Sequence, residues 1–300
     1  NDIYGSQEIL KAGLILAEAI YQNDAFLGQM MGMVPPGGVY THIVGTDIVR
    51  TGENDFFVLE DNVRTPSGVS YMLENRETML NIFPELFSQN KVKTVSNYPK
   101  SLRASLALCA PKSCSDKPTI AVLTPGIHNS AYFEHAYLAQ RMGAELVEGA
   151  DLVVGSDDKV YMKTIRGLAP VDVIYRRIDD AFIDPLCFRP DSMLGVPGLM
   201  DVYRSGGVAI CSAPGAGVAD DKAVYPYVPT IVRYYLGEEP LLPNVETYNL
   251  SDPDQRAYVL PRLDQMVVKP VDGSGGYGIV MGSQASDSEL ATAAETIQAD

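Results

Sequence analysis

Short apolar runs alternate with amphipathic segments through the middle of the chain. Four of these runs predict strands: Thr119–Leu123, Glu145–Glu148, Val171–Tyr175 and Val208–Cys211. Two segments between them predict helices: Ser130–Met142 and Gly198–Ser205. Asp151–Val154 and Val160–Thr164 predict a hairpin around Gly155–Lys159. Strands that alternate with helices are typical of a parallel α/β sheet, so we expect this fold in the middle of the chain.

The two ends of the chain have different patterns. Amphipathic periodicity predicts helices at Ser6–Gln22, Gly68–Leu80, Tyr98–Cys109, Ala223–Leu236 and Ser286–Ala299. Within residues 39–62, two β-rich runs flank the polar turn Thr51–Asp55, which predicts a hairpin. The polar stretch Ala110–Pro118 is the best linker candidate. We therefore expect three parts, residues 1–115, 116–218 and 219–300.

The segment Met266–Val280 combines an apolar strand, a lysine and a glycine-rich loop. Lys269 follows the strand, four glycines lie within six residues, and a second short apolar strand comes next. Glycines let backbone N–H groups approach a polyanion closely. The pattern predicts a site for nucleotide phosphates on a β-hairpin, formed by these residues: Lys269, Gly273, Ser274, Gly275, Gly276 and Gly278.

Other interpretations of the glycine-rich loop are less favoured. A P-loop needs Gly-Lys-Ser/Thr, which the chain lacks. The spacing of Gly273, Gly275 and Gly278 fits a dinucleotide fingerprint, but that motif opens a helix, and Ile279–Gly282 is predicted as a strand. The remaining alternative is a glycine-rich turn without a ligand, which Lys269 disfavours.

Acidic residues on the predicted N-terminal hairpin form a candidate metal site. Asp47 falls on the first strand, and Glu60 and Asn62 lie near the end of the second. Glu60 and Asn62 are two residues apart and share one face, which Asp47 can reach across the ladder. Two carboxylates and an amide oxygen are ligands suited to Mg²⁺. The alternative is a polar hairpin with solvated acids.

Together these residues resemble a known enzyme family. Asp47, Glu60 and Asn62 are spaced like the Mg²⁺-binding residues of ATP-grasp ligases, and Lys269 with its loop resembles their first ATP-binding lysine and phosphate loop. Asp221-Lys222 is similar to the pair that opens their nucleotide-binding domain. Because the metal residues precede the lysine here, the chain resembles the circularly permuted ATP-grasp group, most closely its type 2 members, which are related to glutathionylspermidine synthase. Three segments carry the resemblance over nearly the whole chain: 58–71, 124–135 and 173–180.

The resemblance implies an ATP- and Mg²⁺-dependent carboxylate–amine ligase that works through an acyl phosphate, with a peptide or a glutathionylspermidine-like molecule as substrate. Lys222 and Lys269 would bind the phosphates, and Arg64 would stabilise the acyl phosphate or the oxyanion, unless it only forms a salt bridge beside the hairpin. The synthase has an arginine two positions before the metal aspartate, where this chain has Gly45. Either another cation, Arg50 or Arg64, takes its place, or the chemistry differs from that of the synthase.

The resemblance also implies a mixed α/β fold, with a parallel α/β pre-ATP-grasp domain and parts of an ATP-grasp domain. Because the family has a second lysine, an adenine segment and further acidic ligands after the glycine loop, we expect the chain to be truncated at both ends. Substrate residues would follow the strands of the middle domain, where α/β sheets bind ligands. The candidates are Asn129, Ser130, Glu134, Arg176, Arg177 and Asp179. Ion pairing between domains is the alternative role for this cluster.

Composition narrows the class of partner. A net charge of −15 disfavours nucleic acid, and no apolar run approaches the length of a membrane span. The four cysteines form no C-x-x-C pair and the three histidines show no zinc spacing. We therefore expect a reduced, cytoplasmic protein without a catalytic cysteine or a structural metal. The oligomeric state cannot be read from the pattern.

Two other functions stay open at this point. One is a non-catalytic scaffold that binds a nucleotide or peptide through a degenerate ATP-grasp fold. The other is a phosphotransferase that leaves phosphate on its product. The acidic and basic residues named above favour an enzyme over the scaffold, because a degenerate site would have apolar residues at these positions.

Overall fold

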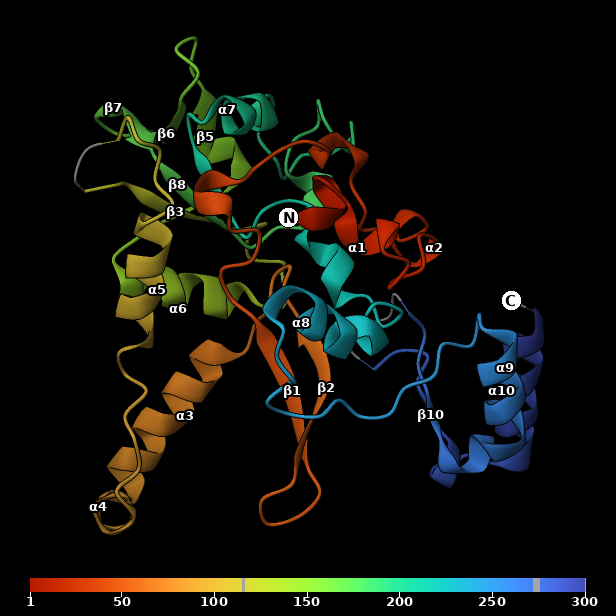
Figure 1. Cartoon of the computed structure of the whole chain (residues 1–300). Helices are drawn as coiled ribbons and strands as arrows, with labels where there is room; N and C mark the ends of the chain where they lie inside the picture. Colours follow the sequence, from red (N-terminus) through yellow and green to blue (C-terminus); the bar gives the residue numbers. More distant parts are fainter. Residues whose placement is uncertain (115–116, 272–275, 300) are drawn as a thin grey trace. The chain divides into compact units, whose positions relative to one another are not determined.

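The computed structural model describes residues 1–114, 117–271 and 276–299 (Figure 1). The chain divides into two compact units, each built from segments that are separate in the sequence. The first unit consists of Asn1–Ser6, Leu27–Gly45 and Asn62–Gly217. The second unit consists of Gln7–Phe26, Thr46–Asp61 and Val218–Asp300.

A four-stranded parallel sheet forms the centre of the first unit, in the order β4-β3-β8-β9. Its strands are β3 (Ile120–Leu123), β4 (Glu145–Val147), β8 (Val173–Arg176) and β9 (Ala209–Cys211). All residues of β3, β8 and β9 are buried. Continuous apolar burial is expected of parallel strands that are covered on both faces. The mixed α/β class with a parallel sheet is thus confirmed.

Helices α5 (Tyr98–Ala107) and α6 (Tyr132–Met142) pack against this sheet (Figure 1). Their apolar faces supply Leu102, Leu106 and Leu138 to a core cluster that includes Val122 of β3. Leu106 and Val122 are completely buried, so the helices and the sheet form one core. Helix α7 (Leu199–Ser205) precedes β9.

A small antiparallel sheet of β5 (Leu152–Val154), β6 (Val160–Thr164) and β7 (Gly167–Val171) also belongs to the first unit. It confirms the expected hairpin and adds a strand. The expected strand Val171–Tyr175 is wrong in its start, since the chain leaves β7 at Val171 and enters β8 at Val173. Between the two strands, the Asp172 carboxylate accepts a hydrogen bond from the Thr119 N–H at 2.8 Å. The Asp172 N–H also donates to Thr119 O at 3.0 Å and its C=O accepts from the Ala209 N–H at 2.9 Å, so backbone bonds continue through the break.

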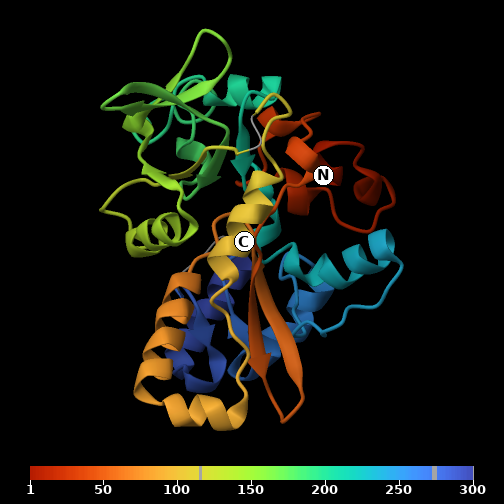
Figure 2. The same ribbon diagram turned by 90° about the vertical axis from the view of Figure 1, so that its left-hand side faces the viewer.

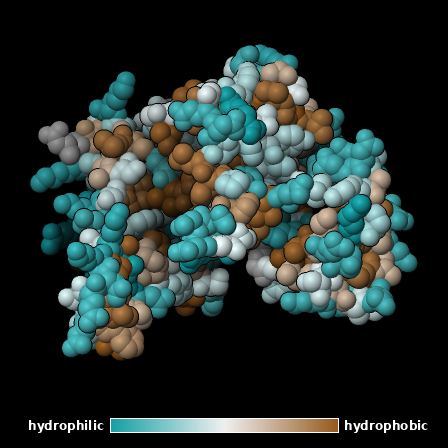
Figure 3. Space-filling model, turned by 60° about the horizontal axis from the view of Figure 1, so that its bottom comes forward, coloured by the Kyte–Doolittle hydropathy of each residue, from teal (hydrophilic) through white to brown (hydrophobic). Residues whose placement is uncertain are grey.

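Helix α3 (Val69–Ile82) confirms the expected helix at Gly68–Leu80 and runs into α4 (Pro84–Asn90). Phe83 lies between them in a non-helical conformation, as expected before a proline. Figure 2 shows α4 turning away from the end of α3. Several large apolar side chains of this pair are exposed, among them Ile82 and Leu86. Figure 3 shows apolar residues, in brown, exposed among polar ones on the face that it draws.

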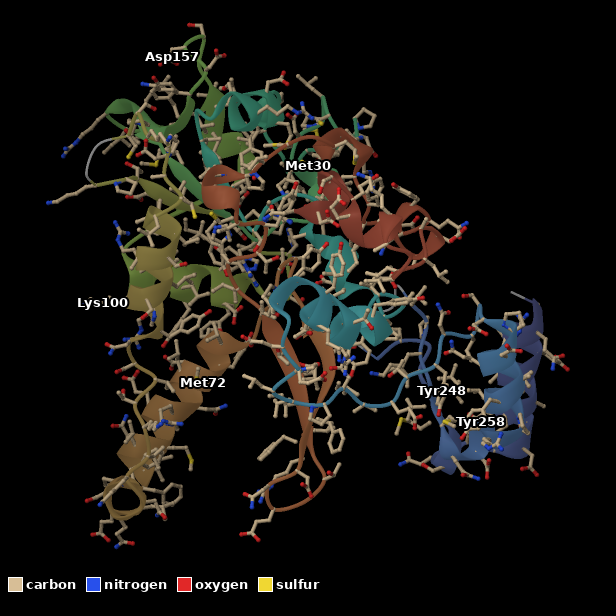
Figure 4. All side chains as sticks on the ribbon, viewed as in Figure 1. Met30, Met72, Lys100, Asp157, Tyr248 and Tyr258 are labelled. Carbon is tan, nitrogen blue, oxygen red and sulfur yellow. The ribbon has the colours of Figure 1, made fainter. Side chains whose placement is uncertain are left out.

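The second unit contains most of the hairpin of β1 (Gly45–Arg50) and β2 (Phe56–Asn62), whose outermost residues Gly45 and Asn62 belong to the first unit. Its remaining elements are α1 (Glu8–Lys11), α2 (Glu18–Tyr21), α8 (Val228–Leu236), α9 (Pro253–Val259), β10 (Val267–Val268), β11 (Val280–Met281) and α10 (Asp287–Ala299). Val259, Leu263 and Ile297 form its core cluster. Beside α9, the rings of Tyr248 and Tyr258 lie 5.2 Å apart (Figure 4).

Two expected helices of this unit have different bounds. Ser6–Gln22 is not one helix but the two short helices α1 and α2, separated by Gly13 at a φ of 67°. Ala223–Leu236 becomes α helical only at Val228, after a 3₁₀ turn. Pro226 and Pro229 are the second residues of these two elements, within the first turn, where the missing N–H of proline costs little.

Nine short 3₁₀ helices connect the described elements: Asp2–Tyr4, Gly28–Met30, Pro36–Gly38, Gly149–Asp151, Asp180–Phe182, Ala216–Asp220, Tyr225–Tyr227, Leu260–Gln265 and Gly282–Gln284. Among the described residues, no helix combines the length and the apolar character needed to cross a membrane.

His135 of α6 is buried where the helix meets the end of β3. Its Nδ1 lies 2.8 Å from the Thr124 hydroxyl, which itself accepts a hydrogen bond from the Gly126 N–H. Burial, together with the positive charge of Arg177, lowers the pKa of His135 from 6.5 to about 4. The folded protein therefore keeps this histidine neutral where an unfolded chain would protonate it.

We expect the free energy of unfolding to fall as the pH is lowered from 6.5 to about 4, because the unfolded chain takes up a proton in this range and the folded one does not. Denaturant unfolding across this range measures the effect, and His135→Gln should flatten the pH dependence. His128 is exposed, so His128→Gln is the matched control and should leave the dependence unchanged. An identical dependence in His135→Gln and the wild type would contradict the assignment.

Candidate functional site

Four charged residues that are far apart in the sequence meet in the second unit. Asp47 lies in β1, Glu60 near the end of β2, Lys222 before the 3₁₀ turn at 225–227, and Lys269 directly after β10. Lys222 Nζ and Lys269 Nζ each lie 3.8 Å from Glu60 Oε2. The side chains of Glu60, Lys222 and Lys269 are 26%, 21% and 24% exposed, so they remain accessible to a ligand. The candidate metal carboxylates and the candidate phosphate lysines thus belong to one site.

The two carboxylates of this site are close enough to influence each other. Partial burial raises the pKa of Asp47, and both the charge of Glu60 and a hydrogen bond with Glu60 raise it further. The positive charge of Lys269 opposes this shift. Two neighbouring carboxylates repel each other unless a proton or a cation lies near both. Their oxygens are the hard ligands that Mg²⁺ takes in proteins.

Glu60 is held in place through the backbone of β2. The Val58 N–H donates to Pro243 O at 2.9 Å, and Val58 O accepts from the Val245 N–H at 2.9 Å. Val58 O also accepts from the Tyr225 hydroxyl at 2.5 Å. This contact of Tyr225 with the strand that carries Glu60 was not predicted, since a bond from a side chain to a distant backbone carbonyl leaves no local pattern.

Lys222 and Lys269 are linked through the backbone of the segment that follows β10. The Lys222 N–H donates to Val271 O at 3.3 Å. Strands β10 and β11 pair antiparallel, Val268 with Val280. The glycine-rich loop therefore joins two strands, which confirms the expected hairpin and excludes the dinucleotide motif.

The glycine-rich loop is described only in part. Gly273, Ser274 and Gly275 lie outside the described residues. Gly276 and Gly278 have φ values of 80° and 74°, a region that favours glycine. A Cβ at Gly278 would also come within 3.2 Å of Pro270 Cγ. Both positions therefore require glycine for conformational reasons, whatever they bind.

Asn62, Gly45 and Arg64 lie in the first unit. The Asn62 amide donates to Gly45 O at 3.4 Å. A Cβ at Gly45 would be 2.9 Å from Pro66 Cβ, so a side chain here, including the arginine of the synthase, requires Pro66 or the backbone to shift. Arg64 Nη1 lies 3.5 Å from Asp179 Oδ1, and the two side chains are 39% and 52% exposed. The salt bridge expected as an alternative for Arg64 is therefore present, with Asp179 as its partner.

Arg50, the other replacement considered for that arginine, is engaged in the hairpin turn. Its Nε donates to Gly52 O and its Nη2 to Glu53 O, both at 2.8 Å. The guanidinium also lies 5.8 Å from the centre of the Phe56 ring. These contacts give Arg50 a role in closing the turn.

Three of the candidate substrate residues are buried in the interior of the first unit. Glu134 is completely buried, and its Oε2 accepts hydrogen bonds from Gly68 N, Ser70 N and Ser70 Oγ at 2.6, 3.1 and 3.0 Å. Its Oε1 lies 3.3 Å from Arg177 Nη2. Since Gly68 and Ser70 stand at the start of α3, the carboxylate caps that helix. These contacts favour a structural role for Glu134.

The two adjacent arginines are also paired within the fold, although Arg177 Nε is buried without a hydrogen-bond partner among the described residues. Arg176 Nη2 lies 2.7 Å from Asp180 Oδ1, and its Nε donates to Ser212 O at 2.6 Å. Arg177 donates to the Tyr175 hydroxyl at 3.2 Å and lies 5.5 Å from the centre of that ring. Both arginines are at most 5% exposed. A substrate carboxylate would have to displace these partners, so the geometry favours ion pairing, here within one unit.

The remaining candidates, Asn129, Ser130 and Asp179, are not buried in this way. Asn129 and Ser130 are exposed and precede α6, which begins at Tyr132 rather than at Ser130. Asn129 Oδ1 accepts from the Ala131 N–H at 2.9 Å. These residues can meet a ligand without rearrangement of the core, and their role stays a prediction.

The chain is similar in sequence to a described protein family and to several known proteins. The profile of a family described as "a circularly permuted ATPgrasp" matches residues 1–300. An uncharacterized protein of Synechocystis sp. is 54% identical over 298 residues, covering 99% of this chain and 62% of that protein. An uncharacterized protein of Mycobacterium tuberculosis is 53% identical over 300 residues, covering all of this chain and 54% of that protein.

A more distant relative has a more specific name. A protein of Frankia casuarinae, provisionally named a glutamate–cysteine ligase, is 41% identical over 301 residues, covering all of this chain and 35% of that protein. The chain therefore spans only part of the length of these relatives. The name of this relative refers to glutamate and cysteine and does not mention glutathionylspermidine.

Mutation of the Glu134–Arg177 pair tests whether Glu134 stabilises the fold or binds the substrate. Glu134→Gln would leave a buried guanidinium without its counter-charge, which costs about 3 kcal/mol or more in the free energy of unfolding. Glu77→Gln removes a partner from an exposed pair with Arg141 and should cost no more than about 1 kcal/mol. Denaturant unfolding measures both. Wild-type stability in Glu134→Gln would instead return Glu134 to the list of substrate ligands.

Proposed function

Because the chain belongs to the family of circularly permuted ATP-grasp proteins, we propose that it carries the site of an ATP- and Mg²⁺-dependent ligase that joins a carboxylate to an amine. The observation that supports this most directly is the meeting of Glu60 with Lys222 and Lys269, each 3.8 Å away. A metal-bound polyphosphate has positive charge on the metal and negative charge on the phosphates. Acidic and basic side chains that meet at an accessible place can therefore bind its two parts.

In this proposal the residues divide the work by charge. Asp47 and Glu60 hold Mg²⁺, with Asn62 assigned to the same ion because it lies two residues beyond Glu60 on the same strand. Lys222 and Lys269 bind the phosphates, whose transfer needs alignment and charge neutralisation more than covalent help. The glycines of the loop, including Gly276 and Gly278, let the backbone approach these phosphates.

Bound Mg·ATP supplies the phosphoryl group that turns an unreactive carboxylate into an acyl phosphate. An oxygen of the substrate carboxylate bonds to the γ-phosphorus as the bond from that phosphorus to ADP breaks. The amine nitrogen then bonds to the acyl carbon, phosphate departs, and the nitrogen loses a proton. Arg64 is proposed to stabilise the acyl phosphate or the oxyanion. Its exposed partner Asp179 holds the guanidinium and is itself a candidate for contact with the amine.

The proposed substrates are an amino acid or a peptide with a free carboxylate, and an amine acceptor. The Frankia relative's name supports amino acids of the glutamate and cysteine kind. A glutathionylspermidine-like substrate is the narrower form of the same proposal. It has less support, because the arginine of the synthase is replaced by Gly45. Asn129 and Ser130 are the candidates for contact with the substrate.

Calorimetric titration with a non-hydrolysable ATP analogue tests the site. We expect binding that depends on Mg²⁺ and is weakened about tenfold or more, roughly 1.4 kcal/mol, by Glu60→Gln and by Lys269→Ala. Glu53→Gln in the exposed hairpin turn and Lys11→Ala are matched controls from the same unit and should bind like the wild type. Tight binding that neither site variant changes would contradict the location, and no binding by the wild type would favour a scaffold that binds a peptide and not a nucleotide.

Product analysis tests the reaction. With ATP, a carboxylate and an amine, a ligase releases ADP and phosphate in equal amounts together with an amide. We expect these products, and their loss in Glu60→Gln. A stable phosphoester in place of free phosphate would show a phosphotransferase and would contradict the ligase.

A further inference from the structure

The first unit brings together the side chains of a histidine and two cysteines. His42 lies in the segment before β1, Cys109 lies just after α5, and Cys211 is the last residue of β9. His42 Nε2 is 2.9 Å from Cys109 Sγ. One atom from each of the three residues, a ring nitrogen of His42 and the two sulfurs, lies within 4.8 Å of the other two. We call these three residues the His–Cys cluster.

Each member of the His–Cys cluster is held by backbone contacts of its own segment. The His42 N–H donates to the Ser212 hydroxyl at 3.3 Å, and the Ala213 N–H donates to Tyr40 O at 2.8 Å. The segment with His42 therefore runs along the end of β9. Cys211 pairs with Tyr175 of β8 in the parallel sheet. The ligand atoms are thus positioned by the core of the unit and not by mobile side chains.

The His–Cys cluster places thiols and an imidazole ring inside an apolar core. Cys211 is completely buried, Cys109 is 6% exposed, and both thiols are free of disulfides. Both cysteines belong to the core cluster formed by α5, α6 and the sheet. His42 Nδ1 is buried and has no hydrogen-bond partner in the part of the chain that the structure describes. Nδ1 is not the ring nitrogen that faces Cys109 Sγ, so the case for an ion rests on the approach of Nε2 and the two sulfurs.

We propose that His42, Cys109 and Cys211 bind a Zn²⁺ ion. Thiolate and imidazole are the ligands that Zn²⁺ prefers, whereas Mg²⁺ takes oxygen. Ligand bonds of about 2.3 Å to sulfur and about 2.0 Å to nitrogen place the three ligand atoms roughly 3.5 to 3.8 Å apart. His42 Nε2 and Cys109 Sγ, which are 2.9 Å apart, therefore have to separate by roughly 0.6 Å to admit the ion. Small side-chain rotations are therefore enough to form the site.

Charge balance favours a divalent cation here. Binding releases the two thiol protons, and two thiolates then neutralise the two positive charges of the ion. A neutral complex is tolerated in an apolar interior where an isolated charge is not. Three protein ligands leave a fourth position for water or another small ligand. His42 is partly exposed and marks the side from which the ion enters.

This site is separate from the proposed nucleotide site and uses none of its residues. It would connect the segment before β1, the end of α5 and the end of β9, because the bonds to one ion join all three. Its consequence is structural. Zn²⁺ should raise the stability of the first unit, while the nucleotide analogue should act on the residues of the second unit.

Spectroscopy with Co²⁺ tests the proposal on the wild-type protein. After treatment with a chelator, the protein is titrated with Co²⁺, and we expect one equivalent to produce a sulfur-to-cobalt charge-transfer band that Zn²⁺ abolishes. X-ray absorption of the Zn²⁺ form should then show two sulfur ligands at about 2.3 Å and one imidazole. The absence of the charge-transfer band, or an ion bound by oxygen alone, would overturn the proposal. Neither readout depends on a variant that folds poorly.

Variants assign the ligands. Cys109→Ser, Cys211→Ser and His42→Gln should each weaken Zn²⁺ binding at least tenfold and abolish or shift the Co²⁺ band. Cys114→Ser and Cys187→Ser are matched controls, because both cysteines lie outside the cluster. An unchanged band in Cys109→Ser, or its loss in Cys187→Ser, would overturn the assignment. The purified, metal-free protein is also checked for a disulfide between Cys109 and Cys211. If such a disulfide is found and its reduction does not produce Zn²⁺ binding, the proposal is overturned.

Discussion

The first unit depends on one buried carboxylate. Glu134 has no exposure to solvent, so its negative charge must be balanced inside the protein. It is balanced by Arg177 at the end of β8 and by the N–H groups at the start of α3. The start of α3, the first turn of α6 and the sheet therefore meet at a single side chain. None of these elements can move away without leaving the charge unpaired.

The second unit also contains a carboxylate that is paired with positively charged side chains, but there the pairs are exposed to solvent. Glu60 is also paired with cations, but the distances to Lys222 and Lys269 are 3.8 Å and about a quarter of each side chain is exposed. Water competes for these charges, so the pairs are weak. A weakly paired and accessible set of charges can exchange partners for a ligand, whereas the buried set around Glu134 cannot. This contrast separates the residues proposed to bind ligands from those that hold the fold.

Local patterns predicted most of the elements but few of the partnerships. The β1–β2 hairpin, α3, α6 and the strands of the parallel sheet follow from periodicity and turn residues, because these signals depend on near neighbours in the sequence. The break at Asp172 was missed, since the last residue of β7 and the first residues of β8 form one apolar run in the sequence. The single helix expected over residues 6–22 was wrong because Gly13 interrupts it.

The contacts of the candidate site were less predictable from the sequence than the helices and strands. The meeting of Lys222 and Lys269 with Glu60 was expected from the family resemblance and not from spacing. The burial of Glu134, Arg176 and Arg177 had no signal in the sequence, because a charged residue after a strand looks the same whether it faces solvent or a buried partner. The His–Cys cluster was missed because no local sequence pattern links its members. Its members are separated by 67 and 102 residues, and only the fold brings them together.

The contact between Gly45 and Pro66 also limits how this sequence can change. A Cβ at position 45 would lie 2.9 Å from Pro66 Cβ, a distance that real Cβ atoms almost never show. An arginine at position 45 therefore requires Pro66 or the backbone to shift, which costs stability because the proline ring is rigid. The cost of that substitution depends on the residue at position 66, so in evolutionary terms the two positions are epistatic.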